Sequence, residues 1–304
     1  MKHLPALGLS LLLGSVALAS PDWADVPVPA EAGAGHTWEV DGRLSLDFNQ
    51  KDKAAALAGK AWADAYINGW KGPGRGHFDS DYSRVKNGNL ELLARWTAPE
   101  KMNLGGVSTT KPLTYPVFVE TRMRVSPTVL SSNFWFLSED DEQELDIVEC
   151  YGTRGSQSGA GGAVNENDRR AADAPGIAGS NYHFFERDPA TNAVIEDHGH
   201  DGKYHEPSDG VAYRDGFHRF GAFWKSPEHV EIYYDGRLVR TLKRDNFTDF
   251  DGKGFHRPMR LILDVEDHAW RVKAGITPSR ESLNDPKQNR MWVDWVRVLR
   301  PVAR

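Results

Sequence analysis

The sequence predicts an all-β protein built as an antiparallel sandwich, and two patterns indicate this fold. First, strand-forming segments of about 6–10 residues recur along the chain with turn residues between them. Second, helical patterning is scarce. Only the alanine-rich Lys53–Ala65 and a turn near Ser279–Leu283 favour a helix. Many short strands with few helices are typical of two packed sheets.

The expected strands follow one another along most of the chain. They are Thr37–Phe48, Asn89–Ala94, Tyr115–Val125, Ser131–Leu137, Glu144–Tyr151, Asn181–Glu186, Phe217–Trp224, Val230–Tyr234, Leu238–Leu242, Met259–Val265 and Met291–Leu299. Asp235-Gly236 is a strong hairpin signal. We expect residues 21–36, rich in Pro, Ala and Gly, to form an extended arm. Because no internal repeat or linker is visible, residues 20–304 are expected to form a single domain.

Residues 1–19 have the pattern of a signal peptide. Lys2 precedes a mostly apolar run, and Ala17-Leu18-Ala19 suits a signal peptidase. This run is too short for a comfortable membrane span, and no later segment is long enough to be one. We therefore expect a secreted protein with no membrane partner. The net charge of −6 and the lack of basic runs argue against binding to nucleic acid.

The only cysteine is Cys150, so an internal disulfide is excluded. We expect Cys150 to be a buried packing residue, because the sequence reveals no neighbouring base that would activate a thiol. Several other site types are also excluded. The run from Asp197 to Asp201 matches no zinc spacing, residues 152–162 lack a P-loop lysine, and no serine hydrolase or metalloprotease motif is present.

The segment Glu144-Leu-Asp-Ile-Val-Glu149 carries three acids among three apolar residues. Strict alternation places Glu144 and Asp146 on one face of a strand and Glu149 on the other. One extra residue after Ile147, a β-bulge, would return Glu149 to the first face. Three carboxylates there would repel one another and raise at least one pKa. Two of them can serve as nucleophile and general acid/base at a glycosidic bond. The alternative is an amphipathic edge strand with a polar face.

The residues before this segment favour the catalytic interpretation. Residues 138–143 are typical of a turn, and a hairpin there would place Trp135 on the adjacent strand, beside the acids. The chain contains ten tryptophans. About half of them suit a core, and the remainder suit stacking on sugar rings.

The acidic segment matches the Glu-x-Asp-x-x-Glu motif of glycoside hydrolase family 16 in its bulged form, and more of the chain resembles the β-agarases of that family. The stretches that carry this resemblance are Asp22-Trp-Ala-Asp-Val-Pro-Val-Pro29, Tyr66-Ile-Asn-Gly-Trp-Lys-Gly-Pro-Gly74, Ser131-Ser-Asn-Phe-Trp135, Tyr182-His-Phe-Phe-Glu-Arg-Asp188, Asp264-Val-Glu-Asp267 and Trp292-Val-Asp-Trp-Val-Arg297. The resemblance covers essentially the whole chain after residue 20.

The resemblance implies a curved jelly roll with an open concave substrate cleft and hydrolysis with retention, without an organic cofactor. Glu144 corresponds to the nucleophile and Glu149 to the acid/base. Asp146 would hydrogen-bond the nucleophile and help set the protonation of the pair. The chemistry is consistent with this, since a nearby negative charge raises the pKa of an acid that must be protonated near neutral pH.

The resemblance also implies substrate-binding positions. Trp135 and Trp70 match aromatic rings that stack on sugars, and either ring could instead be plain core. His183 and Glu266 match residues that hydrogen-bond sugar hydroxyls. Both could instead be satisfied within the sandwich.

Two regions depart from the agarase pattern. Arg75 follows Gly74, where agarases usually carry an aliphatic residue, and an extra cation at the cleft could favour a sulfated galactan. In agarases the region between Gly152 and Asn181 carries an arginine that contacts substrate. Here Arg169 or Arg170 could fill that role.

Relatives in the family often hold a structural calcium ion. The resemblance places it at the turn near Gly88 and at Asp294 of the last strand, whose carbonyl and carboxylate oxygens are suitable ligands for a hard cation. Asp294 could equally be a plain surface acid.

Taken together, these patterns predict a secreted, monomeric endo-β-agarase that cleaves internal β-1,4 bonds of agarose and releases neoagaro-oligosaccharides. Two alternatives stay open. The substrate could be porphyran or another red-algal galactan. The domain could also be a lectin that binds a galactan without cleaving it, although a binder has no need of three acids on one face.

Overall fold

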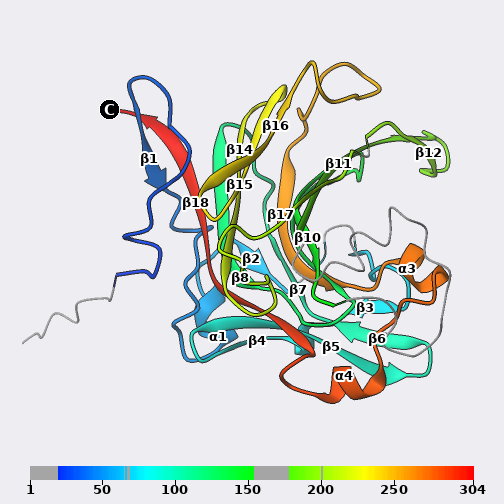
Figure 1. Cartoon of the computed structure of the whole chain (residues 1–304). Coiled ribbons are helices and arrows are strands. Elements are labelled where there is room, and N and C mark those ends of the chain that lie inside the picture. The colour runs from blue at the N-terminus through cyan, green and yellow to red at the C-terminus, as the bar shows by residue number, and fades with distance from the viewer. Residues whose placement is uncertain (1–19, 65, 67–68, 154–177, 200) are drawn as a thin grey trace, which may run out of the picture.

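The described part of the protein folds as two packed β-sheets with short α-helices at their margins (Figure 1). This computed structural model describes residues 20–64, 66, 69–153, 178–199 and 201–304. The strands are β1 (His36–Val40), β2 (Trp62–Ala63), β3 (Gly76–Phe78), β4 (Ser83–Lys86), β5 (Asn89–Ala98), β6 (Lys101–Leu104), β7 (Gly106–Thr109), β8 (Val117–Arg124), β9 (Ser131–Ser138), β10 (Gln143–Tyr151), β11 (Ala178–Arg187), β12 (Val194–Asp197), β13 (Lys203–His205), β14 (His218–Ser226), β15 (His229–Tyr234), β16 (Arg237–Lys243), β17 (Met259–Glu266) and β18 (Arg290–Ala303). The helices are α1 (Lys53–Leu57), α3 (Ala269–Lys273) and α4 (Arg280–Asn284), with a 3-10 turn at Ser80–Tyr82.

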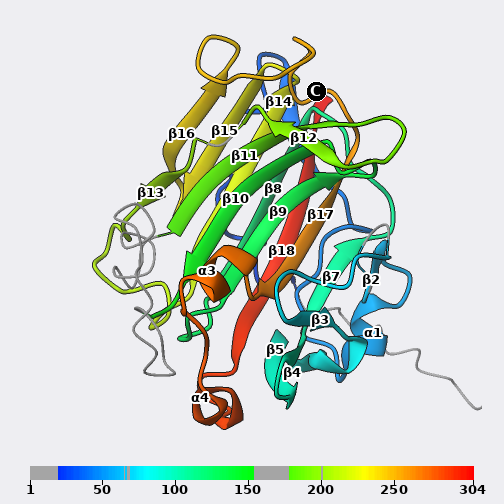
Figure 2. The same ribbon diagram turned by 90° about the vertical axis from the view of Figure 1, so that its right-hand side faces the viewer.

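The two sheets differ in strand order and in shape. One has the order β16-β15-β14-β8-β18-β5-β6-β3, with β1 joined to β18 and β4 joined to β5. The other has the order β12-β11-β10-β9-β17-β7-β2, with β13 joined to β11, and Figure 2 shows its central strands side by side. This second sheet bends, so that β12 and α3 project from its two ends on the same side (Figure 1). We call it the concave sheet and the first one the convex sheet. The predicted curved antiparallel jelly roll is confirmed.

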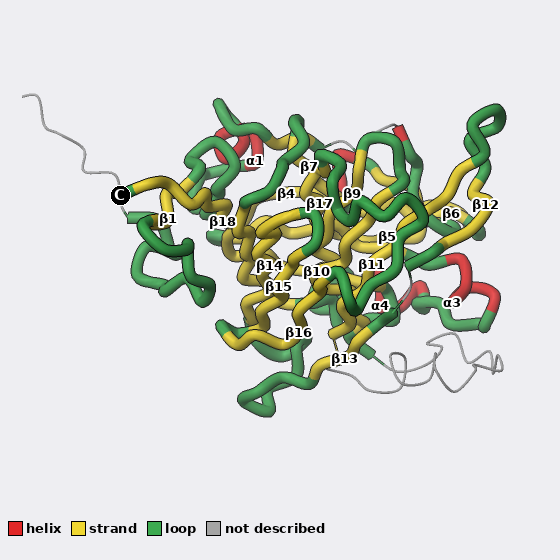
Figure 3. Tube along the Cα trace, turned by 90° about the horizontal axis from the view of Figure 1, so that it is seen from above, coloured by secondary structure: helices red, strands yellow, loops and turns green. Residues whose placement is uncertain are grey.

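The core lies between the two sheets, where apolar side chains of both meet. Phe136 of β9 and Phe184 of β11 are fully buried on the concave sheet, as are Trp224 and Phe220 of β14 on the convex sheet. The rings of Phe136 and Trp224 meet edge to face across the gap, with centroids 5.8 Å apart. The view from above shows the strands filling the centre and the helices lying outside them (Figure 3). The outer face of the concave sheet is therefore free to carry polar chemistry.

Most of the longer predicted strands are confirmed, with boundaries that shift by a few residues. The predicted strand Thr37–Phe48 is wrong beyond Val40, where β1 ends and the chain turns. The hairpin at Asp235-Gly236 is also confirmed, since both residues have positive φ angles, 49° and 77°, as a tight turn between β15 and β16 requires. The prediction did not include the short strands β2, β3, β4, β6, β7, β12 and β13. A strand of two to four residues is too short to show a repeating pattern.

The predicted helix Lys53–Ala65 is wrong beyond Leu57. The Asp52 side chain caps its start by accepting a hydrogen bond from the Ala55 amide at 2.8 Å. The chain then leaves the helix, and Trp62 pairs with Thr109 of β7 instead. Sheet pairing and burial of the Trp62 indole thus override the helix propensity of the alanines.

The N-terminal arm is held on the convex sheet by a buried arginine of the last strand. Arg297 of β18 lies directly opposite Glu120 of β8 in the register, and both side chains are almost fully buried. Its Nε donates to Glu120 Oε2 at 2.8 Å, and its Nη1 donates to the Val26 carbonyl at 2.6 Å. One cation therefore neutralises a buried acid and also fixes the arm, which the sequence predicts to be extended.

Replacing Arg297 with methionine should destabilise the fold strongly. The change keeps much of the apolar stem but leaves the Glu120 carboxylate buried with only Arg219, whose Nη1 is 3.4 Å from Oε1. Removing one partner of a buried ion pair costs about 3–5 kcal/mol. Urea denaturation would measure this loss of unfolding free energy. Arg237→Met, the same change on an exposed arginine of β16, is the control and should cost under ~1 kcal/mol. Equal losses in the two variants would contradict this account.

Candidate active site

A β-bulge in β10 sets the geometry of the site. Asp146 lies opposite Trp135 of β9, whereas Val148 lies opposite Phe134, so Ile147 is one residue in excess. A bulge of this kind returns the next residues to the other face of a strand. The predicted bulge is therefore confirmed, and it falls between Asp146 and Val148.

The bulge divides β10 into an apolar face and an acidic face. The apolar side chains have no exposed surface and pack between the sheets; they belong to Leu145, Ile147, Val148 and Cys150. The acidic side chains of Glu144, Asp146 and Glu149 are 22%, 11% and 27% exposed. The predicted burial of Cys150 is confirmed, and burial raises the pKa of its thiol. The three carboxylates thus share the outer, concave face.

On one side of the acids, β11 supplies His183. This residue lies opposite Glu144 in the register, and its Nε2 is 3.8 Å from Glu144 Oε1 and 3.7 Å from Asp146 Oδ2. Its Nδ1 is 2.6 Å from Asp197 Oδ2 at the end of β12. Burial lowers the pKa of His183, but the hydrogen bond to Asp197 and the charges of the two acids outweigh it and raise that pKa to about 10. His183 is therefore a cation at neutral pH.

The three carboxyls of β10 do not share one environment. Burial, and then the charge of Asp146, raises the pKa of Glu144 well above its ordinary value. Burial raises the pKa of Asp146 to about 6, and the charge of Glu149 acts in the same direction. Burial would also raise the pKa of Glu149, but His268 outweighs it and lowers that pKa to about 2. The expectation that neighbouring negative charge raises the pKa of the acid/base Glu149 is therefore wrong for the free protein, and the raised pKa values are those of Glu144 and Asp146.

On the other side of the acids, β17 holds the ring of Trp135. Asp264 of β17 accepts a hydrogen bond from Trp135 Nε1 at 3.2 Å and another from Asn133 Nδ2 at 2.9 Å. The indole is 6% exposed and packs against Ile262 and Tyr66. Burial raises the pKa of Asp264 to about 7, although both hydrogen bonds act to lower it. As expected from the hairpin, Trp135 stands beside the acids.

Glu266, the second acid of β17, is almost fully buried. Burial, and then the charges of Asp264 and Glu144, raises its pKa well above the ordinary value. Its Oε1 accepts no hydrogen bond from any residue that the structure describes. Glu266 therefore presents to the site a buried carboxyl with a raised pKa and one oxygen that accepts no hydrogen bond from the described residues.

Trp70 lies at one end of a row of aromatic rings that leads to Trp135. The Trp70 side chain is 39% exposed, and its ring meets that of Tyr66 edge to face at 4.7 Å. Tyr66 stacks on Phe78 at 5.0 Å and lies 5.9 Å from Trp135. Tyr66, Trp70 and Phe78, but not Trp135, line a cavity of about 240 Å³ together with neighbouring polar residues. The predicted platform is thus continuous with the face that carries the acids.

His268 was not predicted as a site residue. It lies at the start of α3, and its Nε2 is 2.8 Å from Glu149 Oε1 and 3.5 Å from Glu266 Oε2. Tyr151 Oη donates to the same Glu149 oxygen at 2.8 Å. The signal that could have found His268 is its place directly after the agarase-like stretch that ends at Asp267.

The Arg75 side chain is held by contacts with other residues of the protein. Its Nε donates to Asp267 Oδ2 at 3.3 Å, its Nη2 hydrogen-bonds Thr277, and its guanidinium lies 4.8 Å from the ring centre of Trp96. The side chain is 18% exposed. This geometry gives no support to Arg75 as a ligand for a sulfated sugar. The other candidates, Arg169 and Arg170, lie outside the described residues.

The proposed calcium ligands lie on neighbouring strands of the convex sheet. Val293 pairs with Leu90, which brings Asp294 of β18 next to the turn that contains Gly88. Gly88 has a φ of 75°, and its surroundings include the Asn49 side-chain oxygen. The Asp294 carboxylate forms an ion pair with Arg122, a cation that would compete with a metal. Calcium binding here therefore stays a prediction.

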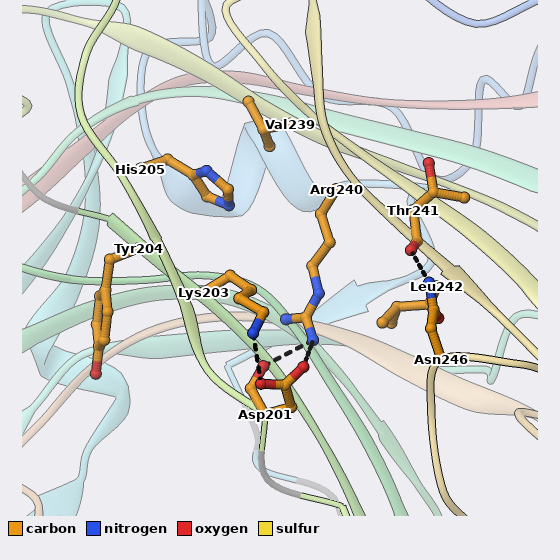
Figure 4. Close-up of a pocket in the computed structure, with 9 residues that line it drawn as sticks. All are labelled: Asp201, Lys203, Tyr204, His205, Val239, Arg240, Thr241, Leu242 and Asn246. Atoms are coloured by element: carbon orange, nitrogen blue, oxygen red, sulfur yellow. Dashed lines mark hydrogen bonds and ion pairs between the residues drawn. The ribbon is translucent and has the colours of Figure 1, made fainter. Parts of the chain in front are cut away.

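A larger cavity of about 510 Å³ lies between β13 and β16 and shares none of the acids (Figure 4). Arg240 is its central residue. Its Nη1 donates to the Ser180 carbonyl at 2.8 Å, and its Nη2 donates to the Asp201 carbonyl at 2.7 Å. These bonds tie β16 of the convex sheet to β11 and to Asp201 just before β13, so Arg240 joins the two sheets. The three acids of β10 lie on the concave face instead, away from this cavity.

Comparison with known proteins decides the family. Residues 38–301 match the family model described as the GH16 domain of β-porphyranases A–D. The chain belongs to glycoside hydrolase family 16. It is 36% identical to β-agarase AgaA of Microbulbifer thermotolerans, over 99% of this chain and 68% of that protein. It is also 36% identical to an extracellular agarase of Streptomyces coelicolor, over 93% of this chain and 90% of that protein.

Other relatives and solved structures agree with this assignment. β-Agarase AgaB34 of Agarivorans albus is 36% identical over 99% of this chain, which spans only 65% of that protein's length. The structure of β-agarase B from Zobellia galactanivorans superposes with a TM-score of 0.78 at 32% identity, covering 93% of this chain and all of that one. β-Porphyranase B of Phocaeicola plebeius is 26% identical over 90% of this family 16 chain.

Asp197→Asn should lower the pKa of His183 from its value of about 10. The substitution keeps the shape of the side chain but removes the anion 2.6 Å from Nδ1, so the imidazolium loses part of its stabilisation. NMR titration of the histidine rings would measure the change. Glu196→Gln, which removes the neighbouring exposed charge on β12, should leave the His183 titration in place. An unchanged pKa in Asp197→Asn would show that Asp197 does not hold the ring.

Proposed function

We propose that this protein is a secreted, monomeric endo-β-agarase that cleaves internal β-1,4 bonds of agarose with net retention and releases neoagaro-oligosaccharides. The observation that carries this proposal is the bulge in β10, which brings Glu144, Asp146 and Glu149 to one face beside Trp135. A strand that keeps three mutually repelling acids together serves catalysis better than binding. Three relatives at 36% identity named as agarases support agarose as the substrate.

In the first step of the proposed reaction, Glu144 attacks the anomeric carbon of a galactose unit while Glu149 protonates the departing glycosidic oxygen. The product of this step is an ester between the sugar and Glu144. In the second step Glu149 takes a proton from water, whose oxygen attacks the same carbon and releases Glu144. Two inversions give net retention, and no organic cofactor takes part.

The reacting protonation state differs from the resting one. In the free protein Glu149 is ionised, whereas the pKa of Glu144 is raised. The proposed reaction needs the opposite distribution, with the proton on Glu149 and the negative charge on Glu144. Asp146 lies between them on the same face, with a pKa of about 6, and is suited to share the proton that Glu144 gives up.

The surrounding residues suit a neutral polysaccharide. Trp70 and Trp135 offer flat apolar faces to pyranose rings. His183 is a cationic donor, and Glu266 presents a buried carboxyl oxygen without a partner in the described structure. Hydroxyl groups of a sugar can supply donors and acceptors to both.

Porphyran hydrolysis is the second candidate, and the porphyranase name of the matching family model favours it. The Arg75 side chain bonds to Asp267, so Arg75 gives no support to a sulfated sugar as the substrate. A non-catalytic lectin is disfavoured by the intact set of three acids.

Secretion rests on the signal-like residues 1–19 and on the extracellular agarase among the relatives. None of the helices that the structure describes is long and apolar enough to cross a bilayer. A calcium ion, if bound, would take the Gly88 carbonyl and the Asp294 carboxylate after Arg122 moves aside, and its role would be structural.

Removing either catalytic carboxyl should abolish most turnover on agarose without unfolding the protein. Glu149→Gln should lower kcat by about 10²–10⁴-fold, because the amide cannot protonate the leaving group. Glu144→Gln should lower it at least as far, since an amide is a poor nucleophile. Reducing-sugar release would measure both, with circular dichroism to check the fold. Glu231→Gln on the convex sheet is the matched control and should keep wild-type activity. If either variant retains most activity, the role given to that residue is wrong.

Substrate preference should appear when agarose and porphyran are compared in parallel, with Glu144→Gln as the blank. We expect oligosaccharide release from agarose by residues 20–304, and none in the variant. Release from porphyran alone would keep the mechanism and change the substrate. No release from either, with retardation of the protein in a gel containing agarose, would identify a lectin and overturn the proposal.

A further inference from the structure

We infer that His268 is a positioning residue for the acid/base Glu149. It holds one oxygen of that carboxyl in place, so that the other faces the glycosidic bond, and its charge sets the pH range of the reaction. The inference rests on the proposed function, because it concerns the delivery of a proton to a sugar. His268 does not belong to the Glu-x-Asp-x-x-Glu motif.

The first observation is that Glu149 Oε1 faces two residues of the protein. Tyr151 Oη donates to this oxygen at 2.8 Å, and His268 Nε2 forms an ion pair with it at 2.8 Å. The His268 contact is a close approach of charges and not an aligned hydrogen bond. With Oε1 held toward these two residues, Oε2 is the oxygen left to carry a proton to the leaving group.

The second observation is that close packing fixes the backbone directly before His268. A Cβ atom on Gly74, which has a φ of 58°, would come within 2.2 Å of the Asp267 carbonyl oxygen, so only glycine permits this approach. The Asp267 side chain is held by Arg75. The turn at Gly74 and the ion pair therefore fix the chain at Asp267, the residue directly before His268.

The third observation is that aromatic rings hold the imidazole from the sides. Trp270 of α3 lies nearly parallel to it, with centroids 6.2 Å apart and an interplanar angle of 27°. The Tyr151 ring meets it edge to face at 6.0 Å. His268 thus packs between the rings of Trp270 and Tyr151 at the start of α3.

The charges around His268 favour its protonated form. From β10 it faces Glu149 and, farther away, Asp146; from β17 it faces Glu266 and Asp264; and from α3 it faces Arg271. Burial lowers the pKa of His268, as does Arg271, but Glu149 outweighs both and raises it. An imidazolium here keeps the carboxyls ionised to lower pH than they would otherwise be.

Loss of the charge alone should shift the pH dependence of the enzyme. His268→Gln keeps an N–H donor but removes the cation, so the pKa of Glu149 rises and those of nearby carboxyls follow. The pH profile of kcat/KM on agarose should then move to higher pH by about 1–3 units. His268→Ala removes the donor as well and should lower kcat by about 100-fold at its optimum. His268→Gln should retain most of the kcat that His268→Ala loses.

A second readout separates positioning from general damage. An aryl glycoside with a good leaving group needs little protonation, so His268→Ala should slow its first step much less than it slows agarose cleavage. His229→Gln is the matched control, because it removes a histidine 3.2 Å from Glu231 on the convex sheet. It should leave both the profile and the rates unchanged. An equal fall at every pH and on both substrates in His268→Gln would overturn the inference.

NMR titration tests the pair without any turnover. The His268 ring, assigned through His268→Gln, should titrate at lower pH in Glu149→Gln than in the wild type, because the facing anion is gone. An unchanged titration would overturn the inference whatever the activity. If the wild-type protein cleaves no galactan, the proposed function fails separately, and the titration alone decides whether His268 holds Glu149.

Discussion

The fold must offset the mutual repulsion of three carboxyls that share one face of β10. They belong to Glu144, Asp146 and Glu149. Placing three carboxylates on one partly buried surface opposes ionisation of all of them. The bulge at Ile147 creates this conflict, since a regular strand would turn Glu149 into the apolar core. The same bulge keeps Ile147 and Val148 buried between the sheets. Catalytic geometry and core packing therefore depend on one irregularity of the backbone.

Two histidines from different elements offset the repulsion among the carboxyls, one at each end of the acidic row. His183 approaches Glu144 and Asp146 from β11, and Asp197 keeps it charged. His268 approaches Glu149 from the start of α3. The result is an asymmetric row in which the carboxyls have different proton affinities. In the free protein this separation is the reverse of the one that the proposed roles need, because the acid Glu149 has the lowered pKa and the nucleophile Glu144 the raised one.

Much of this arrangement could be predicted from the sequence because it follows from local patterns. The alternation in β10, the turn before it and the tryptophan in β9 were enough to place Trp135 beside the acids. The helix at Lys53–Ala65 was mispredicted because pairing of Trp62 with β7 is a long-range effect. His268 could not be found from spacing alone, since it reaches Glu149 from far along the chain through the packing of α3. The partner of Arg75 could not be predicted for the same reason, because Asp267 is also distant in sequence.

The central claim is that Glu144 and Glu149 act from opposite faces of one sugar, and azide rescue tests it most directly. Glu149→Ala and Glu144→Ala would each be incubated with sodium azide and an aryl β-glycoside that carries the agarose repeat. The account predicts a β-glycosyl azide from Glu149→Ala, formed from the ester on Glu144, and an α-glycosyl azide from Glu144→Ala, formed by direct displacement. The reverse pattern of products would exchange the two roles, and the absence of rescue in both variants would contradict the mechanism.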